Sequence, residues 1–124
     1  MESSQNEKLA RFLTSRSHYS PGNRVVKARA FMPHDEELSV FCVAGLPYSD
    51  IVALGDNLNL PPQRRLHGHA ILGEKQVIDK DLSVARDDSP PRHANIRGWP
   101  PEKHQRLAIA QDLAAAADLF VHSA

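Results

Sequence analysis

The chain has 124 residues, of which 41% are hydrophobic and 24% charged, and its 15 lysines and arginines balance 15 aspartates and glutamates. This length suits a single domain with its own core, and a formal net charge of zero argues against a strongly basic nucleic-acid coat or a polybasic membrane anchor. The single cysteine, Cys42, excludes an intramolecular disulfide and a cysteine-rich zinc site.

Three features of the chain predict a cytoplasmic protein. No apolar run approaches the roughly 20 residues that a membrane-spanning helix needs. The N-terminal stretch MESSQNEK is polar and lacks the apolar segment of a signal peptide. Cys42 lies within the apolar run LSVFCVAGL, and a lone thiol in a buried run fits a reducing compartment.

The first part of the chain predicts one short helix and two strands. Residues 1–6 are expected to be disordered, and residues 7–124 to form a single α+β domain. Apolar residues at helical spacing predict a short helix or docking segment over residues 7–16. Alternating apolar and basic residues predict a strand over residues 24–32, and residues 38–46, apolar on both faces, predict a central strand.

The rest of the chain predicts two helices and further strands. A short helix is expected over residues 47–57 and a long C-terminal helix over residues 101–122, which carries an apolar stripe. Strands are expected at residues 65–72, 82–88 and 92–97. Residues 73–81 are expected to form a turn with a short edge strand. The order predicts an α+β domain with a mainly antiparallel sheet of four or five strands and the C-terminal helix packed on one face.

Histidines and arginines alternate along two of these predicted strands. A period of two places their polar side chains opposite the apolar ones, and if both apolar faces pack beneath the C-terminal helix, the polar side chains share one face of the sheet. The candidate catalytic residues are His67, His69 and His93. The candidate substrate-binding residues, which include two from the predicted strand at 24–32, are Arg65, Asn95, Arg97, Lys27 and Arg29.

A solvated sheet face would also carry polar residues, and this is the simplest alternative. Such a face usually shows Lys, Glu and Thr, whereas these strands show His, Asn and Arg. Those are the side chains that bind phosphate, transfer protons or ligate metal, so their presence favours a functional site.

Three functions fit this set of residues. In the first, histidines act as general acid and base while arginines hold a phosphate, as in small ribonuclease toxins, with which the chain shares residue types only. In the second, the three histidines hold zinc, and Asp87 or Asp88 orients an imidazole. In the third, the same face docks a partner, with Trp99 as an interface anchor.

The metal site is the less favoured of these, because Gly68 loosens the strand and Arg65 and Arg97 place positive charge beside the cation. The prediction is therefore a domain without metal or cofactor that handles phosphate or nucleic acid, as a ribonuclease-type toxin or a defence-associated hydrolase. The alternative is a non-enzymatic subunit that docks a protein or nucleic-acid partner through the same face. The expected ligand is RNA or another phosphate-bearing molecule, with no membrane contact, and catalysis itself and the oligomeric state are left open.

Overall fold

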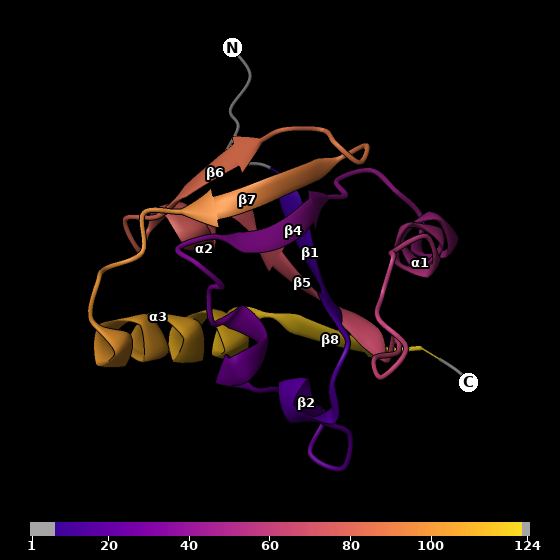
Figure 1. Cartoon of the computed structure of the whole chain (residues 1–124), viewed down its shortest axis with the longest axis horizontal. Coiled ribbons are helices and arrows are strands. Elements are labelled where there is room, and N and C mark those ends of the chain that lie inside the picture. Colours follow the sequence, from indigo (N-terminus) through magenta and orange to yellow (C-terminus); the bar gives the residue numbers. More distant parts are fainter. Residues whose placement is uncertain (1–6, 123–124) are drawn as a thin grey trace.

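A computed structural model describes residues 7–122, and its main feature is a six-stranded antiparallel sheet (Figure 1). The strands of this sheet are β1 (Lys8–Leu13), β4 (Leu38–Cys42), β5 (Gly68–Gly73), β6 (Ser83–Arg86), β7 (His93–Arg97) and β8 (Asp118–Val121). Their order across the sheet is β6-β7-β4-β1-β5-β8, so β1 and β4 lie at the centre. A second, two-stranded sheet pairs β2 (Tyr19–Ser20) with β3 (Val25–Val26).

Helices cover both faces of the large sheet (Figure 1). The helical segments are α1 (Tyr48–Asp56), α2 (Glu74–Ile78) and α3 (Lys103–Ala116), with the short 3-10 helices η2 (Arg16–His18) and η3 (Ala28–Phe31). α3 and η3 pack on one face, and α1 packs on the opposite face. None of the helices within residues 7–122 has the length and apolar character that crossing a membrane requires.

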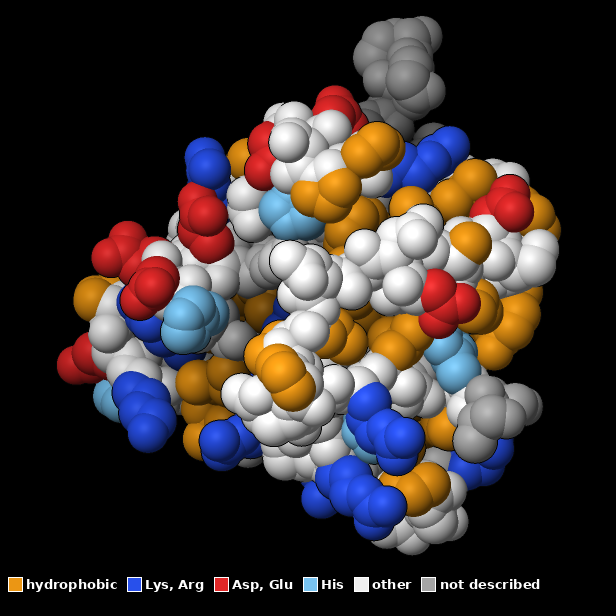
Figure 2. Space-filling view, turned by 45° about the vertical axis from the view of Figure 1, so that its right-hand side comes forward, with side chains coloured by type: hydrophobic (Ala, Val, Ile, Leu, Met, Phe, Trp, Pro, Cys, Tyr) orange, Lys and Arg blue, Asp and Glu red, His pale blue; other side chains and the backbone are white. Residues whose placement is uncertain are grey.

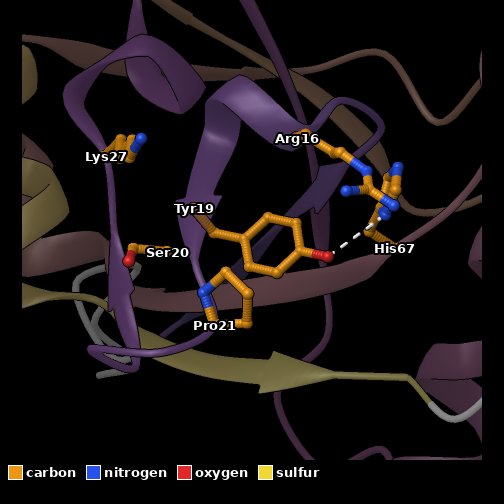
Figure 3. A pocket seen from close by; sticks show the side chains of 6 residues that line it. All are labelled: Arg16, Tyr19, Ser20, Pro21, Lys27 and His67. Atoms are coloured by element: carbon orange, nitrogen blue, oxygen red, sulfur yellow. Dashed lines mark hydrogen bonds between the residues drawn. The ribbon is translucent and has the colours of Figure 1, made fainter.

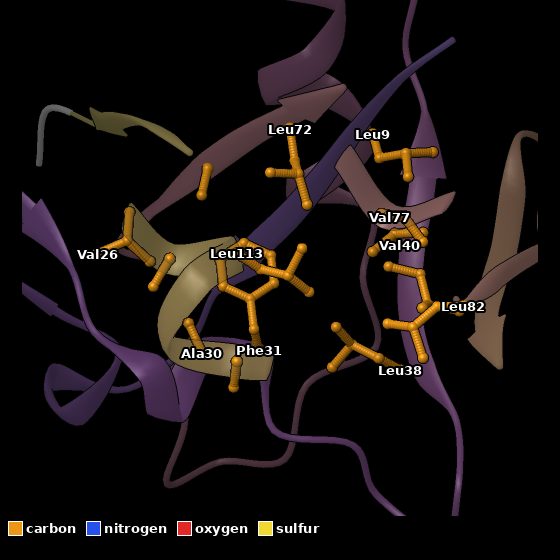
Figure 4. Close-up of a cluster of buried hydrophobic side chains, with 14 of the residues drawn as sticks. Leu9, Val26, Ala30, Phe31, Leu38, Val40, Leu72, Val77, Leu82 and Leu113 are labelled. Carbon is orange, nitrogen blue, oxygen red and sulfur yellow. The ribbon is translucent and has the colours of Figure 1, made fainter. Parts of the chain in front are cut away.

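The centre of the sheet is buried on both faces. The larger cluster, on the α3 face, includes Leu9, Val40, Leu72, Leu113 and Phe31 (Figure 4). The smaller cluster, on the α1 face, consists of Ala10, Phe12, Phe41, Val43 and Ile51. Because successive strand residues point to opposite faces, β1 and β4 contribute to both clusters and hold the two helical layers together.

The predicted fold class is confirmed: the domain is α+β, with a mainly antiparallel sheet and a helix near the C-terminus. The sheet has six strands, where four or five were predicted. The predicted strands at 38–46, 65–72, 82–88 and 92–97 correspond to β4, β5, β6 and β7, and the predicted helix at 47–57 corresponds to α1.

The predicted helix over residues 7–16 is wrong, because this segment forms the central strand β1. Leu9 and Leu13 are buried in the α3-face cluster, and Ala10 and Phe12 in the α1-face cluster. A strand that is buried on both faces loses the polar alternation that identifies strands in a sequence. A short apolar run of this kind cannot be told from a helix by periodicity alone.

Two further segments differ from the prediction. Residues 24–32 were expected to form a strand, but they form the two-residue strand β3 and then η3, which buries Ala30 and Phe31 against α3. Residues 73–81 were expected to form a turn and an edge strand, but Glu74–Ile78 within this segment form the helix α2. The Gln76 side-chain oxygen accepts a hydrogen bond from the backbone N–H of Gly73 at 2.9 Å, which caps the first turn of that helix.

The C-terminal helix also ends earlier than predicted. α3 stops at Ala116, and the residues that follow form β8, which pairs with β5 at the edge of the sheet. The alanine run prolongs the helical pattern in the sequence, whereas Phe120 and Val121 are residue types that strands favour. Residues 1–6, for which disorder was predicted, lie outside the described residues.

The close approach of β8 to β5 depends on Gly68. A Cβ atom at this position would overlap the carbonyl oxygen of Phe120 and would lie 3.0 Å from the Cα of Val121. We expect Gly68→Ala to lower the free energy of unfolding by about 1–3 kcal/mol, because the backbone must move to admit the methyl group. Gly22→Ala is the matched control, since a Cβ there meets no atom within 4 Å. Urea unfolding measures the stability of both variants, and equal unfolding midpoints for the two would contradict the prediction.

Candidate functional site

His93, Asn95 and Arg97 lie on one face of β7, next to the central strand β4. Asn95 is directly opposite Ser39 in the β4–β7 ladder. Arg97 Nε lies 2.5 Å from Glu37 Oε2 and forms an ion pair with it. We call this set of side chains the polar row, and it consists of Glu37, Ser39, His93, Asn95 and Arg97.

The imidazole of His93 is held between a hydroxyl and a carboxylate. Its Nε2 lies 2.5 Å from Ser39 Oγ, and its Nδ1 lies 2.8 Å from Asp87 Oδ1. Asp87 also accepts hydrogen bonds from the Asn95 side chain at 3.3 Å and from the Ser89 backbone N–H at 3.1 Å. Asp87 is therefore the carboxylate that orients this histidine.

The charges and exposure of these groups permit proton transfer. The hydrogen bonds from His93 and from the Ser89 backbone lower the pKa of Asp87 below its usual value, so the carboxylate is ionised at neutral pH. The His93 ring is half-buried and packs edge-on against Phe41, with the ring centroids 5.4 Å apart. Ser39 is exposed. An oriented imidazole beside an accessible hydroxyl can take the proton of that hydroxyl.

His67 lies away from the polar row, in the wall of a cavity beside β2 (Figure 3). This Tyr19 cavity, of about 390 Å³, is lined by Arg16, Tyr19, Ser20, Pro21, Lys27 and His67. The Nδ1 of His67 lies 3.1 Å from the Tyr19 hydroxyl. Burial lowers the pKa of His67, and the positive charges of Arg16 and Arg65 lower it further, so its ring is neutral at pH 7.

His69 occupies a third place, inside the core. It is 1% exposed, its ring stacks on Phe120 with the centroids 5.1 Å apart, and its Nδ1 lies 2.6 Å from His122 Nε2. Burial, with a smaller effect from His122, lowers the pKa of His69 to about 4. His69 is therefore a neutral core residue at neutral pH.

The three candidate histidines are thus separated, and they do not form the three-histidine metal site considered from the sequence. Within residues 7–122, no group of three or more His, Cys, Asp or Glu side chains is placed to hold a metal ion. Cys42 is buried, and burial raises the pKa of its thiol, so it remains neutral in the core.

The other candidates divide between the surface and the core. Lys27 is exposed between β3 and η3, Arg29 is exposed within η3, and Arg65 is exposed just before β5. Trp99 is 8% exposed and belongs to the large core cluster, where its Nε1–H donates to the carbonyl oxygen of Ile96 at 3.0 Å. The structure therefore places Trp99 in the core and not on an open surface.

A second cavity, of about 430 Å³, lies next to Arg11 and includes Arg11, His18, Arg29, His34 and Arg64 in its lining. We call it the Arg11 cavity. η2 contributes to both cavities, with Arg16 in the first and His18 in the second. Burial and the nearby charge of Arg64 lower the pKa of Arg11 to about 10. Burial, followed by the charges of Arg11 and Arg64, lowers the pKa of His18 to about 4.

Five basic side chains line these two cavities, and the charge of a sixth, Arg65, acts on His67. Together the six are called the basic end: Arg11, Arg16, Lys27, Arg29, Arg64 and Arg65. Among the described residues, none of the six forms an ion pair with a carboxylate. Figure 2 shows Lys and Arg side chains, and no Asp or Glu, at the lower end of the face that it displays. Cations that are close together and lack a counter-ion repel one another, and a bound anion would relieve that repulsion.

Sequence reasoning did not single out Ser39, Arg11, Arg16, Arg64 or His18 as site residues. Ser39 is 54 residues from His93 along the chain, so only the strand register brings them together. Arg16 and Arg64 lie in segments where polar and apolar residues do not alternate regularly. The adjacent pair of arginines at 64 and 65 was the one local signal of concentrated positive charge.

Comparison of the chain with models of protein families, with curated proteins and with solved structures finds no match. The function is therefore inferred from the geometry alone.

The two most deeply buried histidines make stability depend on pH. The folded-state pKa values of His18 and His69, about 4, lie below the value of about 6.5 expected in the unfolded chain. Their stabilising contribution is complete above about pH 6.5 and is lost as pH falls toward 4, because protons then favour the unfolded chain. We expect protonation of each of these two histidines to lower the free energy of unfolding by roughly 2 kcal/mol between pH 7 and pH 5.

His69→Phe tests this dependence, since phenylalanine keeps the stacking on Phe120 and cannot titrate. Urea unfolding at the two pH values should show a smaller loss for His69→Phe than for the unchanged protein. His34→Gln, at an exposed position, should behave like the unchanged protein. An undiminished loss in His69→Phe would rule out the buried imidazole as a source of the effect.

Proposed function

We propose that the domain binds a phosphate-bearing ligand at its basic end, and that this ligand is single-stranded RNA. The observation that carries the proposal is the convergence of five basic side chains, without carboxylate partners among the described residues, on two cavities that share η2. Guanidinium groups match phosphate oxygens in pairs of hydrogen bonds. Two neighbouring basic cavities suit a ligand that carries more than one phosphate, as a nucleic-acid strand does.

The zero net charge of the chain is compatible with this proposal, because the charges are segregated. Acidic side chains pair with basic ones away from the basic end, as in Lys80 with Asp112 at 2.6 Å and Arg86 with Glu7 at 3.3 Å. Binding to nucleic acid requires a local basic surface and not a basic chain as a whole.

His67 adds a ribonuclease version of the proposal. Its neutral ring lies in the Tyr19 cavity together with Arg16 and Lys27. A neutral imidazole there can accept the proton of a ribose 2′-hydroxyl while the cations hold the phosphate. The 2′-oxygen then bonds to phosphorus, the bond from phosphorus to the 5′-oxygen breaks, and water protonates the leaving oxygen. The hydroxide that remains takes the proton from His67 and restores its neutral ring.

RNA binding should depend on the basic end and on salt. We expect a short fluorescent single-stranded RNA to bind, and the double variant Arg16→Ala, Arg64→Ala to bind at least about tenfold more weakly with a salt slope reduced by about 1 to 2. The control Lys75→Ala, Lys80→Ala removes the same charge from lysines that pair with acids elsewhere. Fluorescence anisotropy across a salt series makes the measurement. Absence of binding, or equal losses in the two double variants, would refute the proposal.

Incubation of the same RNA with the protein, followed by a denaturing gel, distinguishes a ribonuclease from a protein that only binds RNA. Cleavage by the unchanged protein that is lost in His67→Ala, with binding retained, supports the ribonuclease. Intact RNA with binding retained identifies a non-enzymatic docking subunit, which is the alternative that the sequence left open.

A further inference from the structure

The side chains of the hydrogen-bonded series Asp87–His93–Ser39 line neither cavity of the basic end and play no part in the proposed RNA binding. Its three residues come from the β6–β7 connection, from β7 and from the central strand β4. The two hydrogen bonds, of 2.8 Å and 2.5 Å, engage both ring nitrogens of His93. An acid, an imidazole and a hydroxyl joined in this order are the parts of a nucleophilic site.

The backbone of the β6–β7 connection holds this series in place. The N–H groups of Asp87 and Asp88 donate to the carbonyl oxygen of His93 at 3.2 Å and 3.0 Å, and the His93 N–H donates to that of Pro90 at 3.0 Å. The Asn95 side-chain amide donates a hydrogen bond to the second carboxylate oxygen of Asp87. The geometry therefore does not depend on the Ser39 hydroxyl, which can be removed without dismantling the rest.

The charges beside Ser39 distinguish this site from the basic end. The ionised carboxylate of Asp87 faces the imidazole, while Glu37 and Arg97 neutralise one another. Arg11 Nη1 donates to the Ser39 carbonyl oxygen at 2.9 Å, so one positive charge offsets that of Asp87 and the surroundings of Ser39 carry no net charge that would attract an ionic ligand. An uncharged ligand does not depend on such attraction, and the exposed Ser39 is accessible to it.

We propose that Ser39 is the nucleophile of a second site, which hydrolyses uncharged carboxylic esters. Ser39 Oγ attacks the carbonyl carbon and passes its proton to His93 Nε2, and the Asp87 carboxylate stabilises the imidazolium. The bond to the alkoxy oxygen breaks, and the alcohol leaves with the proton from His93. Water, deprotonated by His93, then attacks the acyl-serine, releases the carboxylic acid and returns the proton to Ser39. In this scheme Ser39 and His93 are catalytic residues, and Asp87 and Asn95 are positioning residues.

Covalent labelling gives the direct test. A fluorophosphonate probe should form a bond between phosphorus and Ser39 Oγ with loss of fluoride, and peptide mass spectrometry locates the label. We expect labelling of Ser39 and its loss in Ser39→Ala. Ser83 is the matched control, because it is an exposed serine in register with Arg97 and has no histidine bonded to it among the described residues. Ser83→Ala should label like the unchanged protein, and failure of Ser39 to label would overturn the proposal.

Hydrolysis of 4-nitrophenyl acetate tests turnover. We expect Ser39→Ala and His93→Gln to lower kcat/KM at least about a hundredfold, and Ser83→Ala to leave it unchanged. Asp87→Asn should lower kcat with little change in KM, because it disturbs the orientation of His93 and not substrate binding. Thermal melting of Ser39→Ala checks that the fold is intact. Activity retained in a folded Ser39→Ala protein would overturn the proposal, whatever the result of the RNA experiments.

Discussion

The guanidinium group of Arg11 joins the parts of the molecule on which both candidate sites depend. The β1–β4 ladder pairs only Leu9 with Cys42 and Ala10 with Phe41, and beyond that point the side chain of Arg11 continues the connection. Its Nε donates to the carbonyl oxygen of Ala30 at 2.8 Å, and its Nη1 donates to that of Ser39 at 2.9 Å. One cation thereby fastens η3 and β4 to the central strand. Because these acceptors are neutral carbonyls, the positive charge remains available to an anion in the Arg11 cavity.

The fold places the histidines in different chemical surroundings. His18, His67 and His69 are all kept neutral, chiefly by burial, and nearby arginines reinforce the effect at the first two. His93 instead has a carboxylate partner, since its Nδ1 lies 2.8 Å from Asp87 Oδ1. The sheet thus brings a carboxylate to one histidine and arginines to others, and the two proposed activities rest on this separation.

The sequence predicted the elements whose patterns are local, and it missed those whose partners are distant. β4, β5, β6, β7 and α1 carry continuous, alternating or helical patterns that can be recognised in isolation. β1 was assigned to the wrong class because burial on both faces removes its polar alternation, and β8 because the alanines of α3 extend the helical pattern into it. The position of His93, Asn95 and Arg97 on one face followed from a period of two. The partner Ser39 could not be found in this way, since β4 pairs with β7 only through the register of the folded sheet.

The position of β8 after all the other strands of the sheet in chain order has a consequence for folding during synthesis. β1, β4 and β5 precede it, and one edge of β5 has no strand beside it until β8 emerges after α3. A nascent chain therefore exposes the unpaired N–H and carbonyl groups of β5, and these form a template on which another chain can add a strand. When β8 arrives, it closes that edge, and Gly68 lets its backbone approach closely. Pairing with β8 thus ends the period in which the edge of β5 is open to strands from other chains.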